Sequence, residues 1–313
     1  MAVYTHVPAE ALGALLEHYD IGAATAFKGI AEGVENSNYL LETPAGRFIL
    51  TLYEKRVAEE DLPFFFGLTT HLAQRGLPVP RPVADRDGTL LQRLCARPAA
   101  IVEFLPGVSV SRPTPAHARA AGAALARLHL MGADFAMTRP NALGPAGWRS
   151  LAERMGQAAD EVAPGLAAAI ADELDELLHR WPERLPVGAI HADLFPDNVL
   201  FLGERVSGLI DFYFAATDAY AYDLAVMHVA WGFDPATDQP LPDIAAALLD
   251  GYERERPLSP RERAALPLLA RGAALRFLLT RAWDWLNTPP GALVARKDPL
   301  AFWRRLRALQ SPA

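Results

Sequence analysis

Three polar side chains stand at fixed intervals in an otherwise apolar stretch of the chain, at Asp193, Asn198 and Asp211. Phosphoryl transfer from ATP needs a carboxylate that orients the attacking hydroxyl and accepts its proton, and oxygen ligands that hold Mg²⁺ across the phosphates. One aspartate suits the first task, and an asparagine with a second aspartate suits the second. Each residue alone is also typical of a turn or a strand end. Together, at this spacing, they indicate a kinase-like phosphotransferase.

The segments around these residues predict how they are held. Residues 185–202 read as a short apolar strand, a polar loop and a second strand, and residues 206–210 read as a third strand that ends at Asp211. Leaving a buried polar group unpaired costs about 1–3 kcal/mol. Polar groups placed between apolar strands therefore need a functional reason.

The rest of the chain divides into two parts of different character. Strand-like segments dominate up to Phe104, together with helical patterns at 8–19 and 59–75; the strands are expected at 25–30, 38–43, 47–53, 89–93 and 99–104. Long Ala- and Leu-rich helical patterns follow, at 115–130, 164–181, 241–254 and 260–286. Strands first and helices afterwards predict an α+β fold in two lobes, residues 1–103 and 104–313.

Composition narrows the range of partners. The 313 residues carry a formal net charge of −7 without a basic stripe, which argues against nucleic acid as a partner. No apolar run is long enough to span a bilayer, and residues 1–20 lack the pattern of a signal peptide, so we expect a cytoplasmic protein with no membrane partner. The single cysteine, Cys95, excludes a disulfide framework. A small-molecule substrate remains the best expectation.

The motif His191-x-Asp193-x-x-x-x-Asn198, followed by Ile210-Asp211-Phe212, resembles the catalytic and metal-binding loops of the aminoglycoside and choline phosphotransferase superfamily, which is protein-kinase-like. Longer strings resemble the bacterial homoserine kinases of that superfamily; they are residues 29–39, 48–54, 191–198, 211–215 and 275–291. The resemblance implies a small antiparallel-sheet lobe that binds the nucleotide and a larger, mainly helical lobe with the catalytic loop and acceptor site. It also implies ATP and Mg²⁺ as cofactors and L-homoserine as the substrate.

The resemblance assigns roles around the catalytic loop. It implies that Asp193 is the catalytic base, that Asn198 and Asp211 are magnesium ligands, and that His191 braces the loop by hydrogen bonding. Asp223 matches a superfamily position that supports the catalytic loop from a structural role.

For the nucleotide, the resemblance implies a loop around Gly33 to Ser37 that covers the phosphates, where Asn36 and Ser37 can donate hydrogen bonds. The hinge residues expected to meet adenine through their backbone are Glu103, Phe104 and Leu105. Most of the superfamily has a basic residue on the third strand, against the α- and β-phosphates, where this chain has Thr51. The nearest lysines are Lys28 and Lys55, and surface exposure is the simpler interpretation of each.

Homoserine is a zwitterion, so its site needs an acid for the ammonium and an arginine for the carboxylate. The candidates for the acceptor pocket are Tyr213, Asp218, Arg276, Arg281 and Trp285. For Arg281, an ion pair with Asp284 is an equally good interpretation. For Trp285, core packing is an equally good interpretation.

Three other functions stay open at the level of sequence. One is the same chemistry on another alcohol, such as choline or an aminoglycoside. Another is a nucleotide-binding scaffold without catalysis, suggested by the missing strand lysine. The last is a metal-dependent hydrolase built on His191-x-Asp193, which would need further clustered ligands.

Overall fold

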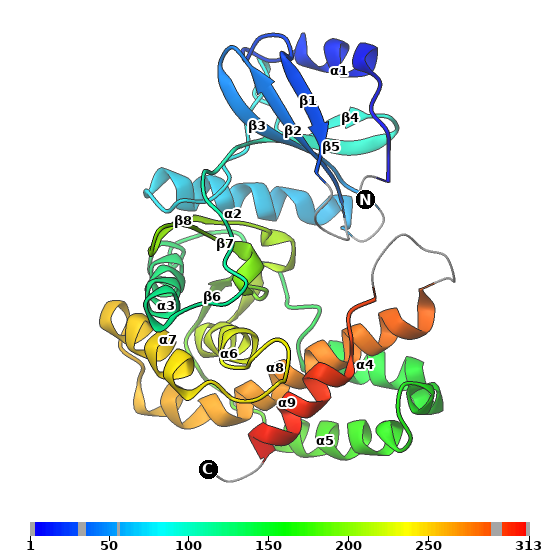
Figure 1. Ribbon diagram of the computed structural model, residues 1–313, viewed down its shortest axis with the longest axis vertical. Coiled ribbons are helices and arrows are strands. Elements are labelled where there is room, and N and C mark those ends of the chain that lie inside the picture. Colours follow the sequence, from blue (N-terminus) through cyan, green and yellow to red (C-terminus); the bar gives the residue numbers. More distant parts are fainter. Residues whose placement is uncertain (1–3, 31–35, 55–56, 289–295, 311–313) are drawn as a thin grey trace. The chain divides into compact units, whose positions relative to one another are not determined.

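The chain folds into two compact units, Met1–Pro106 and Gly107–Ala313. The computed structural model describes residues 4–30, 36–54, 57–288 and 296–310. An antiparallel sheet dominates the first unit, and helices dominate the second (Figure 1).

The sheet of the first unit has the strand order β1-β2-β3-β5-β4, and every neighbouring pair is antiparallel. Its strands are β1 (Ala26–Gly29), β2 (Ser37–Thr43), β3 (Gly46–Leu52), β4 (Gln92–Leu94) and β5 (Arg97–Glu103). The β2–β3 hairpin pairs Thr43 with Gly46 and Asn38 with Thr51. Gly46 has φ 136°, a conformation open mainly to glycine, which explains the residue at this turn.

Two helices accompany the sheet. They are α1 (Ala9–Leu16) and α2 (Leu62–Gln74), the latter preceded by a 3₁₀ turn at Glu59–Asp61. Helix α1 buries Leu12, Leu15 and Leu16, which recur at the three- and four-residue intervals of one helical face. These leucines pack in one core cluster with Leu41 and Leu50 of the sheet.

The second unit is built on a set of packed helices. They are α3 (Pro115–Met131), α4 (Pro145–Met155), α5 (Leu166–Arg180), α6 (Tyr220–Trp231), α7 (Pro242–Glu255), α8 (Pro260–Asn287) and α9 (Leu300–Gln310). Thr114 and Ser259 cap α3 and α8 with full capping boxes, and each helix has proline in its first turn, where no N–H is needed. The main core cluster of this unit includes residues of α4, α5, α6, α8 and α9.

Two short antiparallel strand pairs lie among these helices (Figure 1). They are β6 (Val187–Ile190) with β9 (Ala216–Ala219), and β7 (Val199–Leu202) with β8 (Arg205–Leu209). The loops that carry Asp193 and Asp211 follow β6 and β8. These strand pairs therefore position Asp193, Asn198 and Asp211.

Most long helices and the strands of the first unit were predicted within a few residues, but three helices were missed. Helix α6 has no polar face, because nearly every one of its residues is buried and a helix buried all round lacks amphipathic periodicity. Helices α4 and α9 are both short, with 11 residues each. Strand β6 pairs with β9, a strand that was not predicted. It does not pair with β7, the next strand along the chain.

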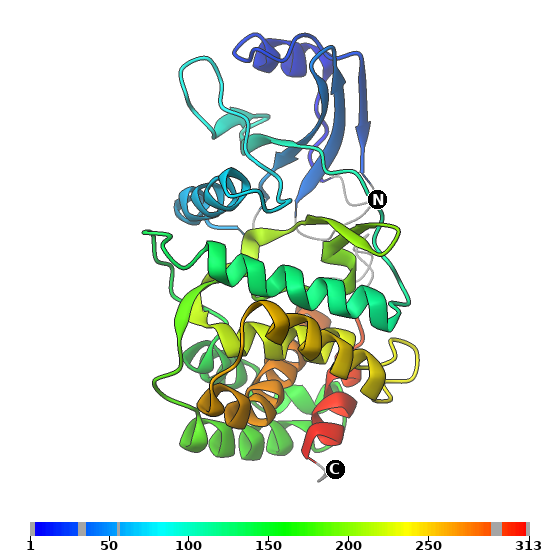
Figure 2. The same ribbon diagram turned by 90° about the vertical axis from the view of Figure 1, so that its left-hand side faces the viewer.

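Helices α3 and α7 pack side by side with their backbones in direct contact (Figure 2). A Cβ atom on Gly122 of α3 would overlap the carbonyl oxygen of Leu248, and one on Gly251 of α7 would overlap that of Arg119. Only glycine allows this approach, since the atoms in the way belong to the backbone and cannot move like a side chain.

We therefore expect Gly122→Ala to lower the free energy of unfolding by about 1–3 kcal/mol, the usual cost of overpacking. The matched control is Gly13→Ala on α1, where a Cβ meets nothing within 4 Å. That change should stabilise by about 0.5–1 kcal/mol, as alanine does inside a helix. Calorimetric unfolding of both variants measures this, and a Gly122→Ala protein as stable as wild type would contradict the packing described.

Candidate active site

The β7–β8 hairpin brings Asn198 and Asp211 to one end of the second unit. Val199 pairs with Leu209, and the Ile210 N–H donates to the Asn198 carbonyl at 3.0 Å. Asp211 follows directly, at φ 66°. This left-handed conformation is uncommon for a residue other than glycine and occurs often at functional sites.

A tight loop connects Asp193 to Asn198. The Phe195 N–H donates to the Asp193 carbonyl at 2.8 Å, and Asn198 Nδ2 donates to the same oxygen at 2.8 Å. Asn198 Nδ2 also lies 3.4 Å from Asp193 Oδ2. The structure thus brings Asp193 and Asn198 together, and the amide nitrogen of Asn198 is directed at the Asp193 loop.

His191 joins the loop after β6 to the end of β8. Its Nδ1 accepts a hydrogen bond from the Asp193 N–H at 3.2 Å, so its Nε2 carries the proton and donates to the Ile210 carbonyl at 2.9 Å. The residue is fully buried, and burial lowers the pKa of its imidazole. A neutral histidine held on both nitrogens is suited to bracing the loop.

Asp223, on the buried helix α6, holds the backbone of the catalytic loop. Its carboxylate accepts the N–H of His191 at 2.7 Å and the N–H of Ala192 at 2.8 Å, as well as His129 Nε2 at 3.0 Å. Burial alone would raise the pKa of Asp223, but the hydrogen bonds from His129 and from the His191 N–H bring it below its usual value. An ionised carboxylate with these donors fixes Ala192 at φ 62°, another left-handed residue.

A line of hydrogen bonds continues from Asp223 toward the start of α8. The hydroxyl of Tyr252 lies 2.7 Å from His129 Nδ1 and accepts a hydrogen bond from Arg256 at 3.2 Å. Arg256 in turn pairs with Glu262 at 2.8 Å. Burial lowers the pKa of His129, so the ring is neutral, with Nε2–H toward Asp223 and Nδ1 accepting from Tyr252. Sequence reasoning missed His129, whose only signal was a histidine in an Ala- and Leu-rich helix.

Arg276 lies beneath the catalytic loop and not in an open acceptor pocket. Its side chain is 1% exposed, its Nη1 donates to the Ala192 carbonyl, and its Nη2 is 3.7 Å from Asp193 Oδ1. This corrects the predicted contact with the acceptor, because a carboxylate in solution cannot reach so buried a guanidinium. Burial raises the pKa of Asp193, while the charges of Arg276 and Lys297 partly offset that rise.

Arg281 lies on the same helix and differs in its surroundings. The guanidinium stacks over the ring of Phe302 at 4.4 Å, and Nη1 lies 3.3 Å from the Asp298 carbonyl. Within the described ranges no carboxylate, including that of Asp284, forms an ion pair with it. Burial, followed by the charge of Arg305, lowers the pKa of Arg281 to about 10.

The other acceptor candidates are more scattered. Tyr213 is half-buried in the 3₁₀ turn after Asp211. Asp218 lies in β9 and accepts from Asn141 Nδ2 at 2.8 Å. Trp285 is 38% exposed and stacks with Arg296 at 5.6 Å. No hydrogen bond or ion pair in the described part of the chain joins Asp218 or Trp285 to Asp193.

In the first unit, the predicted phosphate-loop residues are only partly described. Gly33 lies outside the described residues, as does Lys55, and Lys28 is exposed on β1. Ser37 is fully buried and donates to Glu54 at 2.7 Å while accepting the N–H groups of Tyr4 and Thr5. This differs from the predicted donation to a phosphate, because the single hydroxyl proton of Ser37 is directed at Glu54.

The neighbours of Ser37 are also engaged within the sheet. Asn36 Oδ1 accepts the Glu54 N–H at 3.3 Å. Thr51, at the position where a basic residue was expected, donates to Asn38 Oδ1 at 2.8 Å and is 2% exposed. A neutral hydrogen-bonded pair thus occupies the place of the phosphate-binding lysine.

The predicted hinge follows β5 at the end of the first unit. Glu103 pairs with Arg81 at 2.7 Å, and Arg47 lies 4.7 Å from the ring of Phe104. Among the described residues, no hydrogen bond involves the backbone N–H of Leu105. A donor of this kind is what adenine recognition through the backbone requires.

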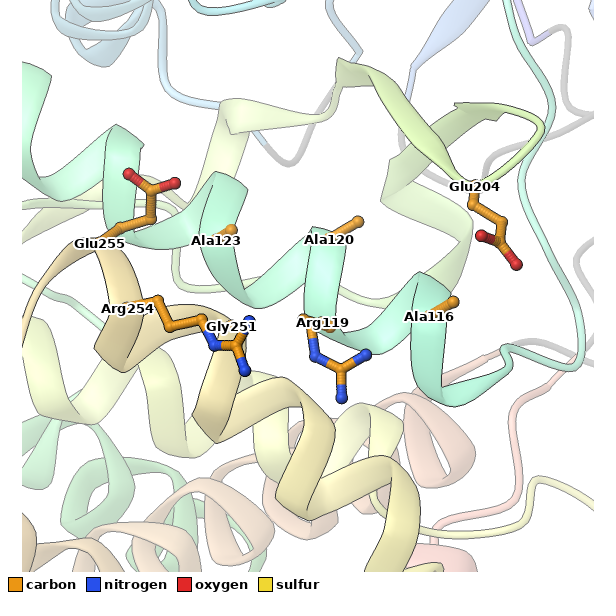
Figure 3. Close-up of a pocket in the computed structure, with 8 residues that line it drawn as sticks. All are labelled: Ala116, Arg119, Ala120, Ala123, Glu204, Gly251, Arg254 and Glu255. Atoms are coloured by element: carbon orange, nitrogen blue, oxygen red, sulfur yellow. The ribbon is translucent and has the colours of Figure 1, made fainter.

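A groove of about 370 Å³ opens on the surface of the second unit beside the α3–α7 contact (Figure 3). Its lining residues are Ala116, Arg119, Ala120, Ala123, Glu204, Gly251, Arg254 and Glu255. Arg119 and Arg254 both pair with Asp250, at 2.8 and 2.9 Å. The groove contains none of the predicted site residues.

The donor set of Asn198 and Asp211 fits a magnesium ion. Across the described residues, no group of three or more His, Cys, Asp and Glu side chains could hold a metal by itself. Mg²⁺ usually takes one or two carboxylates and completes its shell with water and substrate phosphates. One amide and one carboxylate, carried on neighbouring strand ends of the hairpin, therefore suit an ion that binds together with a nucleotide.

A family model described as the phosphotransferase enzyme family matches residues 26–258. The chain belongs to this phosphotransferase family. Among the curated relatives of the phosphotransferase, a homoserine kinase of Xanthobacter autotrophicus is 60% identical over 99% of this chain and 97% of its own length. A homoserine kinase of Acidiphilium cryptum is 59% identical over 98% of this chain and 96% of its own.

Solved structures share the fold of the phosphotransferase. An amicoumacin kinase in complex with AMP-PNP, Ca²⁺ and Ami has a TM-score of 0.73 at 16% identity, covering 96% of this chain and 92% of its own. A choline/ethanolamine kinase family protein from Mesorhizobium loti has a TM-score of 0.64 at 18% identity, covering 97% of this chain and 94% of its own. The predicted family and the predicted protein-kinase-like α+β fold are both confirmed. No helix in the described ranges has the length and apolar character needed to cross a bilayer.

The role of Asp223 can be tested by replacing it with asparagine. Whichever way the amide of Asp223→Asn is turned, an NH₂ group faces a buried donor, so we expect a loss of about 2–4 kcal/mol of unfolding free energy. We also expect kcat to fall about 10²-fold, as for a displacement of the catalytic loop by 1 Å. Denaturant titration and steady-state kinetics measure the two effects.

Asp250→Asn is the matched control, because it makes the same chemical change at an aspartate whose ion pairs lie on the surface. It should cost less than about 1 kcal/mol and leave kcat unchanged. Equal effects of the two substitutions would remove the special role given to Asp223.

Proposed function

We propose that this phosphotransferase is an ATP-dependent homoserine kinase, which converts L-homoserine to O-phospho-L-homoserine in threonine biosynthesis. The observation that carries the proposal is 60% identity to curated homoserine kinases over nearly the whole of both chains. The geometry of the Asp193 loop supports the reaction type independently. The base for a hydroxyl acceptor needs to be held in a fixed position, and Asp193 is a partly buried aspartate whose backbone is held by several hydrogen bonds.

Asp193 would act as the base. Its backbone is fixed by His191 through the N–H and by Asn198 through the carbonyl, which leaves the carboxylate to turn toward an acceptor. In the transfer, the acceptor hydroxyl proton moves to this carboxylate and a bond forms between the acceptor oxygen and the γ-phosphorus. The bond from the γ-phosphorus to the β–γ bridging oxygen breaks, and ADP leaves with that electron pair. Burial raises the pKa of Asp193, which makes it a better proton acceptor than an ordinary aspartate.

Asn198 and Asp211 would hold Mg²⁺, which supplies positive charge against the phosphate oxygens when bound. The hydrogen bond between Ile210 and Asn198 keeps the two side chains in register. Because the same asparagine also donates to the Asp193 carbonyl, the position of the base is linked to that of the metal ligands.

The nucleotide base would be recognised by the first unit. The N–H of Leu105, which has no hydrogen-bond partner among the described residues, is a suitable donor for adenine. We assign nucleotide binding to residues 1–103 together with this hinge at Glu103, Phe104 and Leu105. Thr51 and Asn38 contribute a neutral pair in place of a cation. The charge of the phosphates would therefore be balanced mainly by Mg²⁺.

The direct test is an acceptor panel with Mg-ATP, read by ADP release. L-Homoserine should give the highest kcat/KM, with choline and kanamycin as the rival acceptors. Higher kcat/KM with choline or kanamycin, and no turnover of homoserine, would overturn the assignment of the substrate.

Asp193→Asn should lower kcat for homoserine by about 10²–10⁴-fold, the contribution of a general base. Substrate binding should change little, because the amide has the same shape. Asp197→Asn, at an exposed carboxylate of the same loop, should change kcat by less than tenfold. Turnover by Asp193→Asn at the wild-type rate would exclude Asp193 as the base and leave a nucleotide-binding role for the site.

A further inference from the structure

The last turns of α8 carry an arginine that the catalytic loop does not use. Phe277 of α8 packs edge-on against Phe195 of the loop at 4.9 Å and against Phe302 of α9, also at 4.9 Å. Arg281 lies over the ring of a third member of this aromatic group, the buried Phe302. The aromatic group therefore connects Arg281 to the loop that carries Asp193.

The surrounding arginines are compensated by acids. On α9, Arg304 and Arg305 both pair with Asp238, at 2.6 and 2.9 Å. Arg281 has only the Asp298 carbonyl at 3.3 Å, and no carboxylate within the described residues lies at ion-pair distance. Arg281 is thus a half-buried cation, and the acid near it is already paired with other arginines.

The energetic consequence is visible in the pKa of Arg281, which burial and the charge of Arg305 lower to about 10. At neutral pH the side chain still carries its charge, but the protein stabilises that charge less than water does. A guanidinium stacked on a ring keeps its N–H donors in the plane free for a two-pronged contact with a carboxylate. A bound anion at this place would supply the negative charge that Arg281 lacks among the described residues.

We propose that Arg281 binds the α-carboxylate of the acceptor and thereby selects an amino acid alcohol over an uncharged or cationic alcohol. The inference rests on the proposed homoserine kinase function, since it assigns one group of that substrate. The proposal requires the hydroxyl at the other end of the acceptor to reach Asp193, whose loop packs on α8 through Phe195 and Phe277. Exposed Lys297, whose charge lowers the pKa of Asp193, adds positive potential on the same side.

The test compares acceptors with and without the carboxylate. In Arg281→Gln, kcat/KM for L-homoserine should fall about 10- to 10²-fold, as for loss of hydrogen bonds to a charged group. For 3-aminopropan-1-ol, which is homoserine without its carboxylate, the value should change less than about threefold. Arg281→Lys, which keeps the charge without the two-pronged geometry, should give an intermediate loss.

Inhibition constants give a second measurement that does not depend on turnover of a poor acceptor. L-2-Aminobutyrate, which has the carboxylate but no hydroxyl, should inhibit Arg281→Gln about 10- to 10²-fold more weakly than wild type. Inhibition of homoserine turnover by 3-aminopropan-1-ol should stay the same. Arg261→Gln, at an exposed arginine near the start of α8, should behave as wild type with every compound.

Stability separates binding from a structural role. Because Arg281 is a poorly stabilised cation, Arg281→Gln without substrate should melt at or above the wild-type temperature, whereas the rise in melting temperature that L-homoserine gives wild type should be lost. A lower melting point with equal losses for both acceptors, or an unchanged inhibition constant for L-2-aminobutyrate, would overturn the role of Arg281 while the kinase assignment stood. If wild type phosphorylated other alcohols and not homoserine, the proposed function itself would fail.

Discussion

One carboxylate, that of Asp223, sets the course of the chain through the active site. It accepts two successive backbone N–H groups, from His191 and Ala192, and so stabilises a left-handed turn that alanine rarely adopts. Asp193 is the next residue, and its direction follows from that turn. Because Asp223 lies on a helix buried on all sides, the turn is anchored to the core of the second unit and not to a surface loop.

Positive charge around the site is arranged in two ways. Arg276 is buried under the loop, where it satisfies the Ala192 carbonyl and balances the charge of Asp193. Arg281, five residues later on the same helix, has no acid partner among the described residues and stacks over the ring of Phe302. A single helix therefore provides both a structural cation and a cation available to a ligand, and burial decides which is which.

The sequence was sufficient for the part of the site that is local. Asp193, Asn198 and Asp211 belong to neighbouring strands and loops, so their spacing alone indicated a common site, and the hairpin of the structure brings Asn198 and Asp211 together. His129, Tyr252 and Arg276 approach the loop from helices distant in sequence, and no local pattern marks such contacts. The burial of Ser37 and of Arg276 was missed for the same reason, since the side that a polar residue faces is decided by tertiary packing. Helix α6 was missed because it has no polar face.

The glycine contact between α3 and α7 has a consequence for how the enzyme tolerates mutation. Gly122 lies two turns before His129 on α3, and Gly251 directly precedes Tyr252 on α7. The two helices that touch through glycine are thus the same two that carry the histidine and tyrosine of the hydrogen-bonded line to Asp223. The spacing of that line is therefore set by the glycine contact between α3 and α7, which involves no polar side-chain atom. In a genetic screen for lost activity, substitutions at this crossing would appear as active-site defects, although they touch no group that meets a substrate.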